Sequence, residues 1–256
     1  MVRRGSRALI NAEILSARKE LQAELAAQKE YTVIENRGGR GLIHRQCDLD
    51  TETLPDWFDE QLLTSDRYKH DTTSTVAPCC YGDNHWVIKR YNRQSLVHGL
   101  KLTLRSSRAR RAFLVGLLLR KLGINTPKPL AYLETRSGIL PGNSYILYEK
   151  SSGDTLHDLL MTGRLQAEQW PSAVDRTRVL VEKLHRLGIT HGDIKHTNLM
   201  LCGESLEVID LDSLRIHRLP WRFARYQEKD LRAVEKRIGG DPEAYVAYKK
   251  VALANR

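Results

Sequence analysis

The chain has 256 residues, 41% of them hydrophobic, which is enough to build one large domain or two lobes around a cleft. No apolar run approaches the roughly 20 residues that a membrane-spanning helix requires. The basic amino terminus also lacks the apolar core of a secretory signal, so a cytoplasmic location is expected.

The basic excess is concentrated in one segment. The chain has 41 basic and 31 acidic residues, a formal net charge of +10, yet residues 84–133 contain no Asp or Glu and 11 Lys or Arg. Such a segment predicts an anionic partner: nucleotide phosphates, a phosphorylated sugar, an acidic membrane surface or nucleic acid. Nucleic acid is the least favoured, because no aromatic residues alternate with the arginines. A merely solvated face is the remaining alternative.

The first half of the chain predicts a helix followed by strands. Apolar residues near a 3.6 period predict a helix over residues 6–29. Short β-like pieces follow at 31–34 and 41–44. A hairpin is expected between residues 68 and 92, with its turn at Gly82-Asp83-Asn84.

The middle of the chain predicts a helix and a further strand. The helix is expected to begin near Ser106 or Ser107, which can cap it, and to end at Gly123. Ser144–Tyr148 is predicted to be a strand. Residues 150–154 have the composition of a link between lobes.

The second half predicts mostly helices. One helix is expected over Pro171–Leu187, followed by a loop, a hairpin of residues 199–202 and 206–211, and a helical tail. This order predicts an α+β protein in two lobes. The expected division is an extension over residues 1–60, a small β-rich lobe over 61–149 and a reduced helical lobe over 150–256.

One segment carries most of the chemical information. Residues 191–198 read His-Gly-Asp-Ile-Lys-His-Thr-Asn, and Val208-Ile209-Asp210-Leu211-Asp212 follows. The first run resembles the protein-kinase-like catalytic loop H-x-D-x-K-x-x-N, and the second resembles the metal-binding strand end that usually reads D-F-G. The resemblance implies a kinase-like fold that binds ATP and Mg²⁺. His191 is expected to hold the loop backbone rather than to react.

The motif assigns a role to each polar position. Asp193 is expected to align the attacking hydroxyl, and Lys195 to neutralise charge at the γ-phosphate. Asn198 and Asp210 are expected to supply oxygen ligands for Mg²⁺. Asp212 stands where the motif has glycine; it could add a second carboxylate near the metal or hydrogen-bond the loop.

The first lobe is expected to hold the nucleotide. Lys89 ends an alternating strand and resembles the kinase lysine that binds the α- and β-phosphates. The stretch from Glu149 to Ser151 resembles the kinase hinge whose backbone N–H and C=O groups form hydrogen bonds with adenine. No glycine-rich loop is present, so hydroxyls such as Thr73 and Ser74, with backbone amides, would cover the phosphates.

The helix after Lys89 lacks the glutamate that normally pairs with this lysine. Either Asp210 or Asp212 replaces it, or phosphate alone holds the lysine. The missing glutamate and the missing glycine-rich loop keep open a pseudokinase, a non-catalytic scaffold at the membrane.

The stretch from about Val87 to Leu231 resembles the bacterial lipopolysaccharide kinase family of the Kdo/WaaP type, including InaA-like members. The matching segments are residues 88–91, 107–113, 123–129, 191–198, 209–212 and 229–231. The resemblance implies transfer of phosphate from ATP to a Kdo or heptose hydroxyl of the lipid A core glycolipid, at the cytoplasmic face of the inner membrane. No obligate protein partner is implied. A RIO-like protein kinase is the nearest alternative.

The resemblance also suggests a use for the basic segment. Its arginines could meet the anionic head group of the acceptor or anionic lipids, or could only coat a helix. The candidates are Arg105, Arg108, Arg110 and Arg111.

Overall fold

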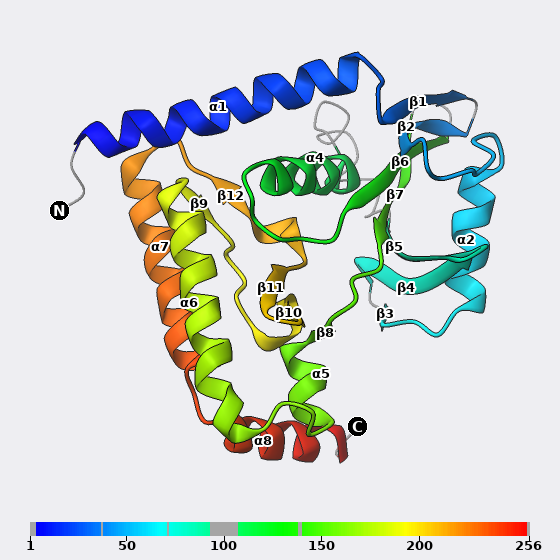
Figure 1. Ribbon diagram of the computed structural model, residues 1–256. Helices are drawn as coiled ribbons and strands as arrows, with labels where there is room; N and C mark the ends of the chain where they lie inside the picture. The colour runs from blue at the N-terminus through cyan, green and yellow to red at the C-terminus, as the bar shows by residue number, and fades with distance from the viewer. Residues whose placement is uncertain (1–3, 37, 71, 93–106, 138–139, 255–256) are drawn as a thin grey trace. The chain divides into compact units, whose positions relative to one another are not determined.

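The computed structural model describes residues 4–36, 38–70, 72–92, 107–137 and 140–254 and divides the chain into two compact units (Figure 1). The sheet unit consists of Arg18–Lys121 and Pro127–Lys150. The helical unit consists of Met1–Ala17, Leu122–Thr126 and Ser151–Arg256. The α+β fold class, with a β-sheet lobe and a helical lobe, is confirmed.

The sheet unit is built on seven antiparallel strands in the order β1-β2-β6-β7-β5-β4-β3. The strands are β1 (Tyr31–Asn36), β2 (Gly39–His44), β3 (Lys69–His70), β4 (Ser74–Tyr81), β5 (Asn84–Tyr91), β6 (Pro129–Ser137) and β7 (Leu140–Glu149). The predicted β4–β5 hairpin is confirmed, with Tyr81 opposite Asn84. Its turn contains Gly82 at φ +57°, a conformation that glycine adopts without strain.

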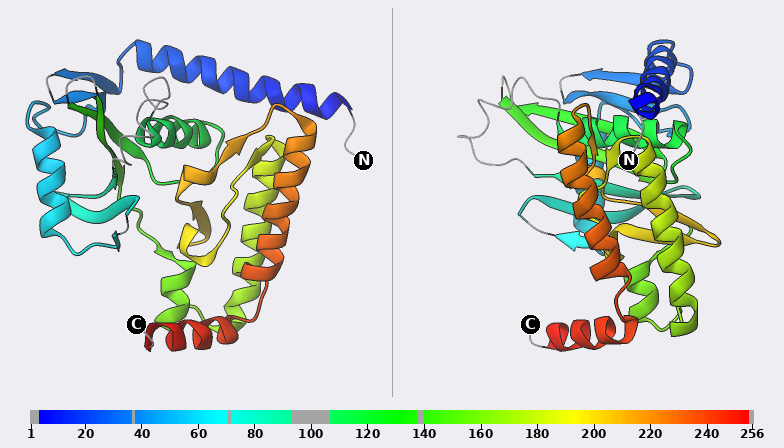
Figure 2. Two further views of the ribbon diagram at one scale, coloured as in Figure 1. Left: turned by 180° about the vertical axis from the view of Figure 1, so that it is seen from behind. Right: turned by 90° about the vertical axis from the view of Figure 1, so that its left-hand side faces the viewer.

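One helix packs on each face of this sheet (Figures 1 and 2). Helix α2 (Leu54–Thr64) buries Leu54, Phe58 and Leu62, spaced four residues apart, in one apolar cluster. Helix α4 (Arg108–Lys121) buries its apolar stripe against the opposite face. Along β5, Ile88 belongs to the α2 cluster and Tyr91 to the α4 cluster. Lys89 alternates with Ile88 and therefore lies on the α4 face.

Helix α4 begins and ends close to the predicted positions. The Ser107 hydroxyl accepts a hydrogen bond from the Arg110 backbone amide at 3.0 Å, the geometry of an amino-terminal cap. Gly123, two residues beyond the last helical residue, adopts φ +68°. Ser106 and Arg105 lie outside the described residues. The Arg108 guanidinium lies 4.6 Å from the centre of the Tyr91 ring.

The helical unit combines helices with two small sheets. Helix α6 buries residues three and four positions apart along one face. The helices are α5 (Leu156–Met161), α6 (Trp170–Arg186), α7 (Pro220–Ala233) and α8 (Pro242–Ala254), and α7 continues into the π-helical turn η4 (Val234–Ile238). The strands are β8 (Asp154–Thr155), β9 (Ile189–Thr190), β10 (Leu199–Cys202), β11 (Ser205–Val208) and β12 (Arg215–Ile216), in the orders β11-β10-β8 and β12-β9.

Several elements differ from the sequence prediction. Strands β1 and β2 join the main sheet through β6, although their residues fall in the extension that is predicted to end at residue 60. Helices α2 and α5 and strand β6 were not predicted, and β11 ends at Val208 rather than Leu211. The predicted first helix is present as α1 (Arg4–Ala26), which is divided between the two units. Within the described residues, every helix is too short or too polar to cross a bilayer.

Candidate active site

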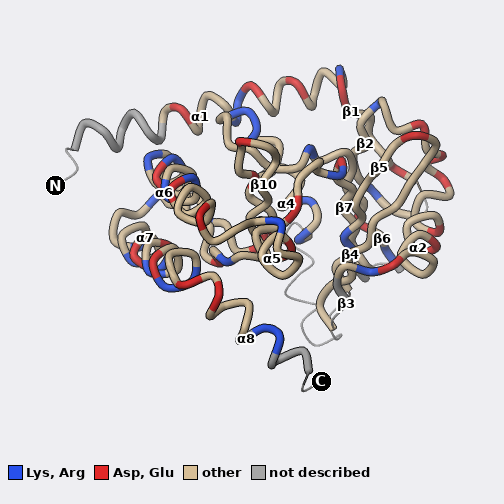
Figure 3. The backbone as a smooth tube through the Cα atoms, turned by 60° about the horizontal axis from the view of Figure 1, so that its bottom comes forward, with Lys and Arg blue, Asp and Glu red and all other residues tan. Residues whose placement is uncertain are grey.

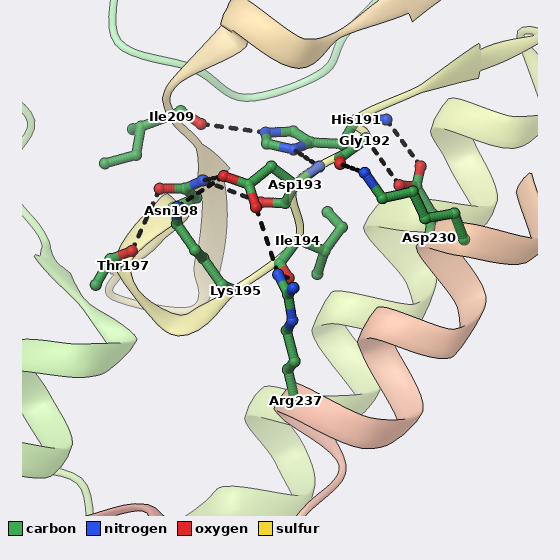
Figure 4. Close-up of polar contacts among 11 residues, drawn as sticks. His191, Gly192, Asp193, Ile194, Lys195, Thr197, Asn198, Ile209, Asp230 and Arg237 are labelled. Carbon is green, nitrogen blue, oxygen red and sulfur yellow. Dashed lines mark hydrogen bonds and ion pairs between the residues drawn. The ribbon is translucent and has the colours of Figure 1, made fainter. Parts of the chain in front are cut away.

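The catalytic-loop motif lies in the helical unit, between β9 and β10 (Figure 4). It ends in a short 3-10 turn, η2 (His196–Asn198). Gly192 adopts φ +82°, and a Cβ atom at this position would lie 2.9 Å from the Ser213 carbonyl oxygen. Glycine is therefore required at position 192 for two reasons: the backbone has positive φ, and a side chain would clash with the Ser213 carbonyl.

Asp193 is the centre of the polar contacts in this loop. Lys195 Nζ donates to Asp193 Oδ2 at 2.7 Å, and Asn198 Nδ2 donates to the same oxygen at 3.2 Å and to the Asp193 carbonyl at 2.9 Å. Arg237, on η4, points at the loop from the helix and donates to Asp193 Oδ1 at 3.4 Å and to the Ile194 carbonyl at 3.2 Å. Two predicted residues, Lys195 and Asn198, therefore contact the Asp193 carboxylate, and the fold adds Arg237 as a third.

The surrounding cations keep Asp193 ionised. Partial burial acts to raise the pKa of its carboxyl, but the Lys195 ammonium and the Arg237 guanidinium outweigh that effect, so the pKa lies below its ordinary value. An ionised carboxylate can accept a hydrogen bond from a substrate hydroxyl and then its proton.

His191 holds the backbone, as predicted. Its side chain is buried, and the Asp193 backbone amide donates to His191 Nδ1 at 3.3 Å. The proton of the neutral ring therefore resides on Nε2, which donates to the Ile209 carbonyl at 3.1 Å. Burial lowers the pKa of His191, which favours this neutral form. The imidazole thus joins the catalytic loop to the segment that carries Asp210.

Asp230 anchors the loop from α7. Its side chain is 1% exposed, and its two oxygens accept hydrogen bonds from the backbone amides of His191 and Gly192, both at 2.8 Å. His185 Nε2 also donates to Asp230, at 3.3 Å. Lys229, the residue before it, donates to the Gly192 carbonyl at 2.6 Å. These contacts fix the backbone directly before Asp193.

The segment with Asp210 is tied to the same loop. The Ile209 backbone amide donates to the Asn198 carbonyl at 3.0 Å, so Asp210 follows a residue bonded directly to Asn198. Asp210 adopts φ +57°, one of two non-glycine residues with positive φ among those described. This conformation costs roughly 1–3 kcal/mol and is concentrated at functional sites. Asp212 lies two residues further, in the 3-10 turn η3 (Leu211–Ser213).

The donor set fits a hard divalent cation. Asn198 Nδ2 is used as a donor, which leaves the amide oxygen Oδ1 as its ligand atom. Carboxylate and amide oxygens are the ligands that Mg²⁺ prefers. In the described part of the chain, no three His, Cys, Asp or Glu side chains form a metal-binding group. The predicted set instead combines one amide with two carboxylates.

An aromatic stack supports the far end of the loop. The ring of His196, which is 4% exposed, lies between Trp170 of α6 and Tyr245 of α8, with centroid distances of 5.4 Å and 3.9 Å. The Tyr245 hydroxyl lies 2.9 Å from His157 Nδ1. The last helix of the chain therefore contacts the catalytic loop through one imidazole.

The stack predicts a pH-dependent stability. Burial lowers the pKa of His196 from its usual 6.5 to about 4, and the cations near it act in the same direction. The unfolded chain therefore binds this proton first as the pH falls from 6.5 towards 4, and the free energy of unfolding drops by on the order of 3 kcal/mol. His196→Phe keeps a ring in the stack but cannot titrate. Urea unfolding across this pH range should give a shallower slope for the variant, and equal slopes would contradict the assignment.

The remaining predicted residues lie in other parts of the fold. Lys89 is on β5, with its Nζ atom 5.0 Å from the centre of the Tyr91 ring. Thr73 precedes β4, and its carbonyl accepts from the Asn92 amide at 3.1 Å. Ser74 begins β4 and is 1% exposed, so protein covers its side chain.

The expected hinge falls at the division between the two units. Glu149 ends β7 and is exposed, and its backbone amide donates to the Lys128 carbonyl at 2.9 Å. Ser151 begins the helical unit, where its hydroxyl lies 3.0 Å from Cys202 Sγ.

Two residues of this site have no role assigned by the catalytic-loop motif. Asp230 and Arg237 lie about 40 residues after the loop, and only the packing of α7 and η4 brings them to it. The signal that could have identified Asp230 is an acidic residue on the inward face of an otherwise amphipathic helix.

Comparisons with known proteins identify the family of the chain. The model of the lipopolysaccharide kinase (Kdo/WaaP) family matches residues 57–249. Two curated relatives are 3-deoxy-D-manno-octulosonic acid kinases. The protein from Vibrio vulnificus is 29% identical over 95 residues, 37% of this chain and 39% of the relative. The protein from Photobacterium profundum is 32% identical over 91 residues, 35% of this chain and 37% of the relative.

The matches thus span well under half the length of these curated relatives. A solved structure, described as WaaP in complex with acyl carrier protein, has a TM-score of 0.48 and 17% identity, and it covers 70% of this chain and 71% of its own. Because the family model extends over three quarters of the sequence and includes the whole catalytic loop, the chain belongs to the lipopolysaccharide kinase (Kdo/WaaP) family.

Proposed function

We propose that this protein transfers the γ-phosphate of ATP to a hydroxyl of a sugar in the lipopolysaccharide inner core. The observation that carries the proposal is the Asp193 carboxylate, held by Lys195 and Asn198 within one loop whose backbone is fixed by a buried aspartate. Family membership supports the reaction class. The names of the two relatives favour 3-deoxy-D-manno-octulosonic acid (Kdo) over heptose as the sugar.

Each of these residues has a separate role in the reaction. The Asp193 carboxylate accepts a hydrogen bond from the sugar hydroxyl and so orients the hydroxyl oxygen towards the γ-phosphate. This oxygen then forms a bond to phosphorus while the bond from phosphorus to ADP breaks. The hydroxyl proton passes to the Asp193 carboxylate. Lys195, 2.7 Å from that carboxylate, neutralises charge that develops on the transferred group. Arg237 holds the other carboxylate oxygen and so fixes the plane of the group.

Metal and nucleotide are assigned to the remaining predicted residues. Asn198 and Asp210, with Asp212 as a further carboxylate, would hold Mg²⁺, which supplies positive charge to the phosphates when bound. We assign phosphate binding to Lys89, with Thr73 in the segment that replaces a glycine-rich loop; the buried side chain of Ser74 is covered by protein and is not assigned to the phosphates. We assign adenine binding to the backbone between Glu149 and Ser151.

The class of acceptor implies where in the cell the protein acts. A lipid A core glycolipid is anchored in a membrane, so we propose that the protein acts as a peripheral protein at the cytoplasmic face of the inner membrane. Its surface would then meet anionic lipid, for which a chain with a net charge of +10 is suited.

Incubation with labelled ATP and purified acceptors tests the function. We expect label on Kdo-bearing lipid A, and less or none on a heptose-bearing core whose Kdo hydroxyls are blocked. Label on added protein instead of glycolipid would indicate a RIO-like protein kinase. Binding of ATP without any transfer would indicate a pseudokinase. Either outcome would overturn the proposal.

Nucleotide binding can be tested separately with Asp210→Asn. Asparagine tolerates the left-handed backbone of this position but removes the charge. Ligand at 100 times its dissociation constant stabilises a protein by about 2.7 kcal/mol, so Mg²⁺ with ATP should raise the melting temperature of the wild type. We expect the variant to lose most of this shift, while Asp175→Asn, an exposed aspartate on α6, retains it. A full shift in Asp210→Asn would remove this residue from the metal site.

A further inference from the structure

An exposed apolar pair marks the start of α7. Leu219 is 46% exposed and Trp221 is 63% exposed, and all five residues of Arg218–Arg222 are exposed. The other three tryptophans of the chain are buried or partly buried. A single exposed apolar residue is ordinary, but an exposed tryptophan beside an exposed leucine is suited to contact with another surface.

The same segment is purely basic. Residues 213–227 contain four arginines and no Asp or Glu. Among the described residues, none of the four pairs with a carboxylate; the Arg222 guanidinium instead lies 5.2 Å from the centre of the Trp221 ring. We define the α7 docking surface as the exposed side chains Arg218, Leu219, Trp221, Arg222 and Arg225.

Helix geometry turns this surface outward. Phe223, Tyr226 and Asp230 follow the inward face, where Phe223 packs on His185 and His217. Trp221 and Arg225 lie four residues apart on the outer face. Figure 3 marks the charged positions along α7; acidic residues begin only at Glu228, after the docking surface has ended. The apolar and basic groups are therefore presented together.

We infer that the α7 docking surface binds an anionic phospholipid bilayer. Tryptophan is amphipathic and is enriched at membrane interfaces, while arginine can extend its charged end to the lipid phosphates. The three arginines of this surface, which pair with no carboxylate among the described residues, complement a negative surface. One tryptophan and one leucine provide a shallow anchor, which suits reversible peripheral binding. The inference locates the membrane contact that the proposed function requires, but lipid binding itself needs neither ATP nor acceptor.

Sedimentation with vesicles tests the inference on the full chain. We expect binding to vesicles of phosphatidylglycerol and phosphatidylcholine, and little binding to phosphatidylcholine alone. Removing three arginines in the variant R218Q/R222Q/R225Q should weaken binding about 100-fold, since each basic residue near an anionic membrane contributes about 1 kcal/mol. The variant L219S/W221S should weaken it at least about tenfold, through lost apolar contact.

Two control variants match these changes. R164Q/R178Q/R232Q removes the same charge from arginines that already pair with Asp154, Asp175 and Glu228, and it should bind nearly as wild type. L63S removes a leucine that is 71% exposed on α2, beside Asp59 and Glu60, and it should have no effect.

Equal loss in the R164Q/R178Q/R232Q control would reduce the effect to net charge and overturn the inference. So would retention of vesicle binding by both docking-surface variants. Transfer to a soluble, delipidated core oligosaccharide should be unchanged in the docking-surface variants. Failure of the wild type to transfer phosphate to any core acceptor, lipidated or delipidated, with vesicle binding intact, would overturn the proposed function and leave the docking surface standing.

Discussion

Replacing Asp193 by Asn is expected to lower phosphate transfer to the core sugar by about 10³-fold, within the range of 10² to 10⁴ that a positioned acid or base contributes. The amide keeps the size of the carboxylate but cannot take up a proton, and it presents one acceptor oxygen where the carboxylate presents two. Lys195 and Arg237 lose the anion that orients them. The measurement is kcat/KM for the glycolipid acceptor, together with the melting temperature in the presence of Mg²⁺ and ATP.

The control for this variant is Asp154→Asn, which changes an exposed aspartate of the same unit that pairs with Arg164. Its transfer rate should stay close to that of the wild type. Stabilisation by Mg²⁺ and ATP should survive in Asp193→Asn, because the predicted metal ligands are Asn198 and the two carboxylates after β11. Transfer by Asp193→Asn at a rate within tenfold of the wild type would show that another group receives the proton.

Lys195 provides an independent check on the same chemistry. Its ammonium is 2.7 Å from Asp193, so its removal both frees the carboxylate and withdraws positive charge from the transferred group. The effect on the Asp193 carboxylate can be recognised from the pH dependence of the rate. The Lys195 ammonium is the main influence that lowers the pKa of Asp193, so without it the acid limb of the rate profile should move to higher pH.

Local patterns predicted the elements that carry their own start and stop signals. Ser107 caps α4 and Gly123 follows its end, as the sequence indicates. Helix α6 has Pro171 in its first turn and an apolar stripe along one face, and it was predicted within one residue at each end. In these segments the side chains that define the element lie within a few positions of one another.

The missed elements depend on partners distant in sequence. Strand β6 begins with Pro129, a residue that argues against a central strand, yet Pro129 only occupies the end of the pairing with β7, opposite Tyr148. Helix α2 has Leu54, Phe58 and Leu62 at helical spacing, but the acidic loop before it weakens the pattern. Its stability comes from burial against the sheet, which local propensity does not report.

A partner distant in sequence also determines where the β10–β11 hairpin ends. Apolar residues continue past Val208 at Ile209 and Leu211, so the pattern predicts a strand that extends to Leu211. In the fold, the Ile209 amide bonds to the Asn198 carbonyl instead of continuing the ladder, whose last pair joins Leu199 and Val208. The strand therefore stops two residues before Asp210. That early end allows Asp210 to turn into the left-handed conformation beside the loop.

Asp230→Ala should be the most destabilising single change at this site, because it removes one acceptor group from two buried donors. The backbone amides of His191 and Gly192 would lose their partner in a region closed to water. Each unsatisfied buried amide costs about 1–3 kcal/mol, and breaking a buried charged contact costs about 3–5 kcal/mol in total. Urea unfolding followed by circular dichroism should therefore show a free energy of unfolding about 3–5 kcal/mol lower than that of the wild type.

A graded series separates loss of folding from loss of loop geometry. Asp230→Asn retains one acceptor oxygen, so it should lose less stability than Asp230→Ala, while its NH₂ group still opposes one of the two amide donors. Asp175→Ala, an exposed aspartate on α6, should change stability by less than about 1 kcal/mol. At temperatures where Asp230→Asn stays folded, transfer should still fall, because the backbone before Asp193 is no longer held. A folded Asp230→Asn with unchanged kcat would mean that the anchor stabilises the unit without positioning the carboxylate, since the hydrogen bonds at issue end one residue before the group that reacts.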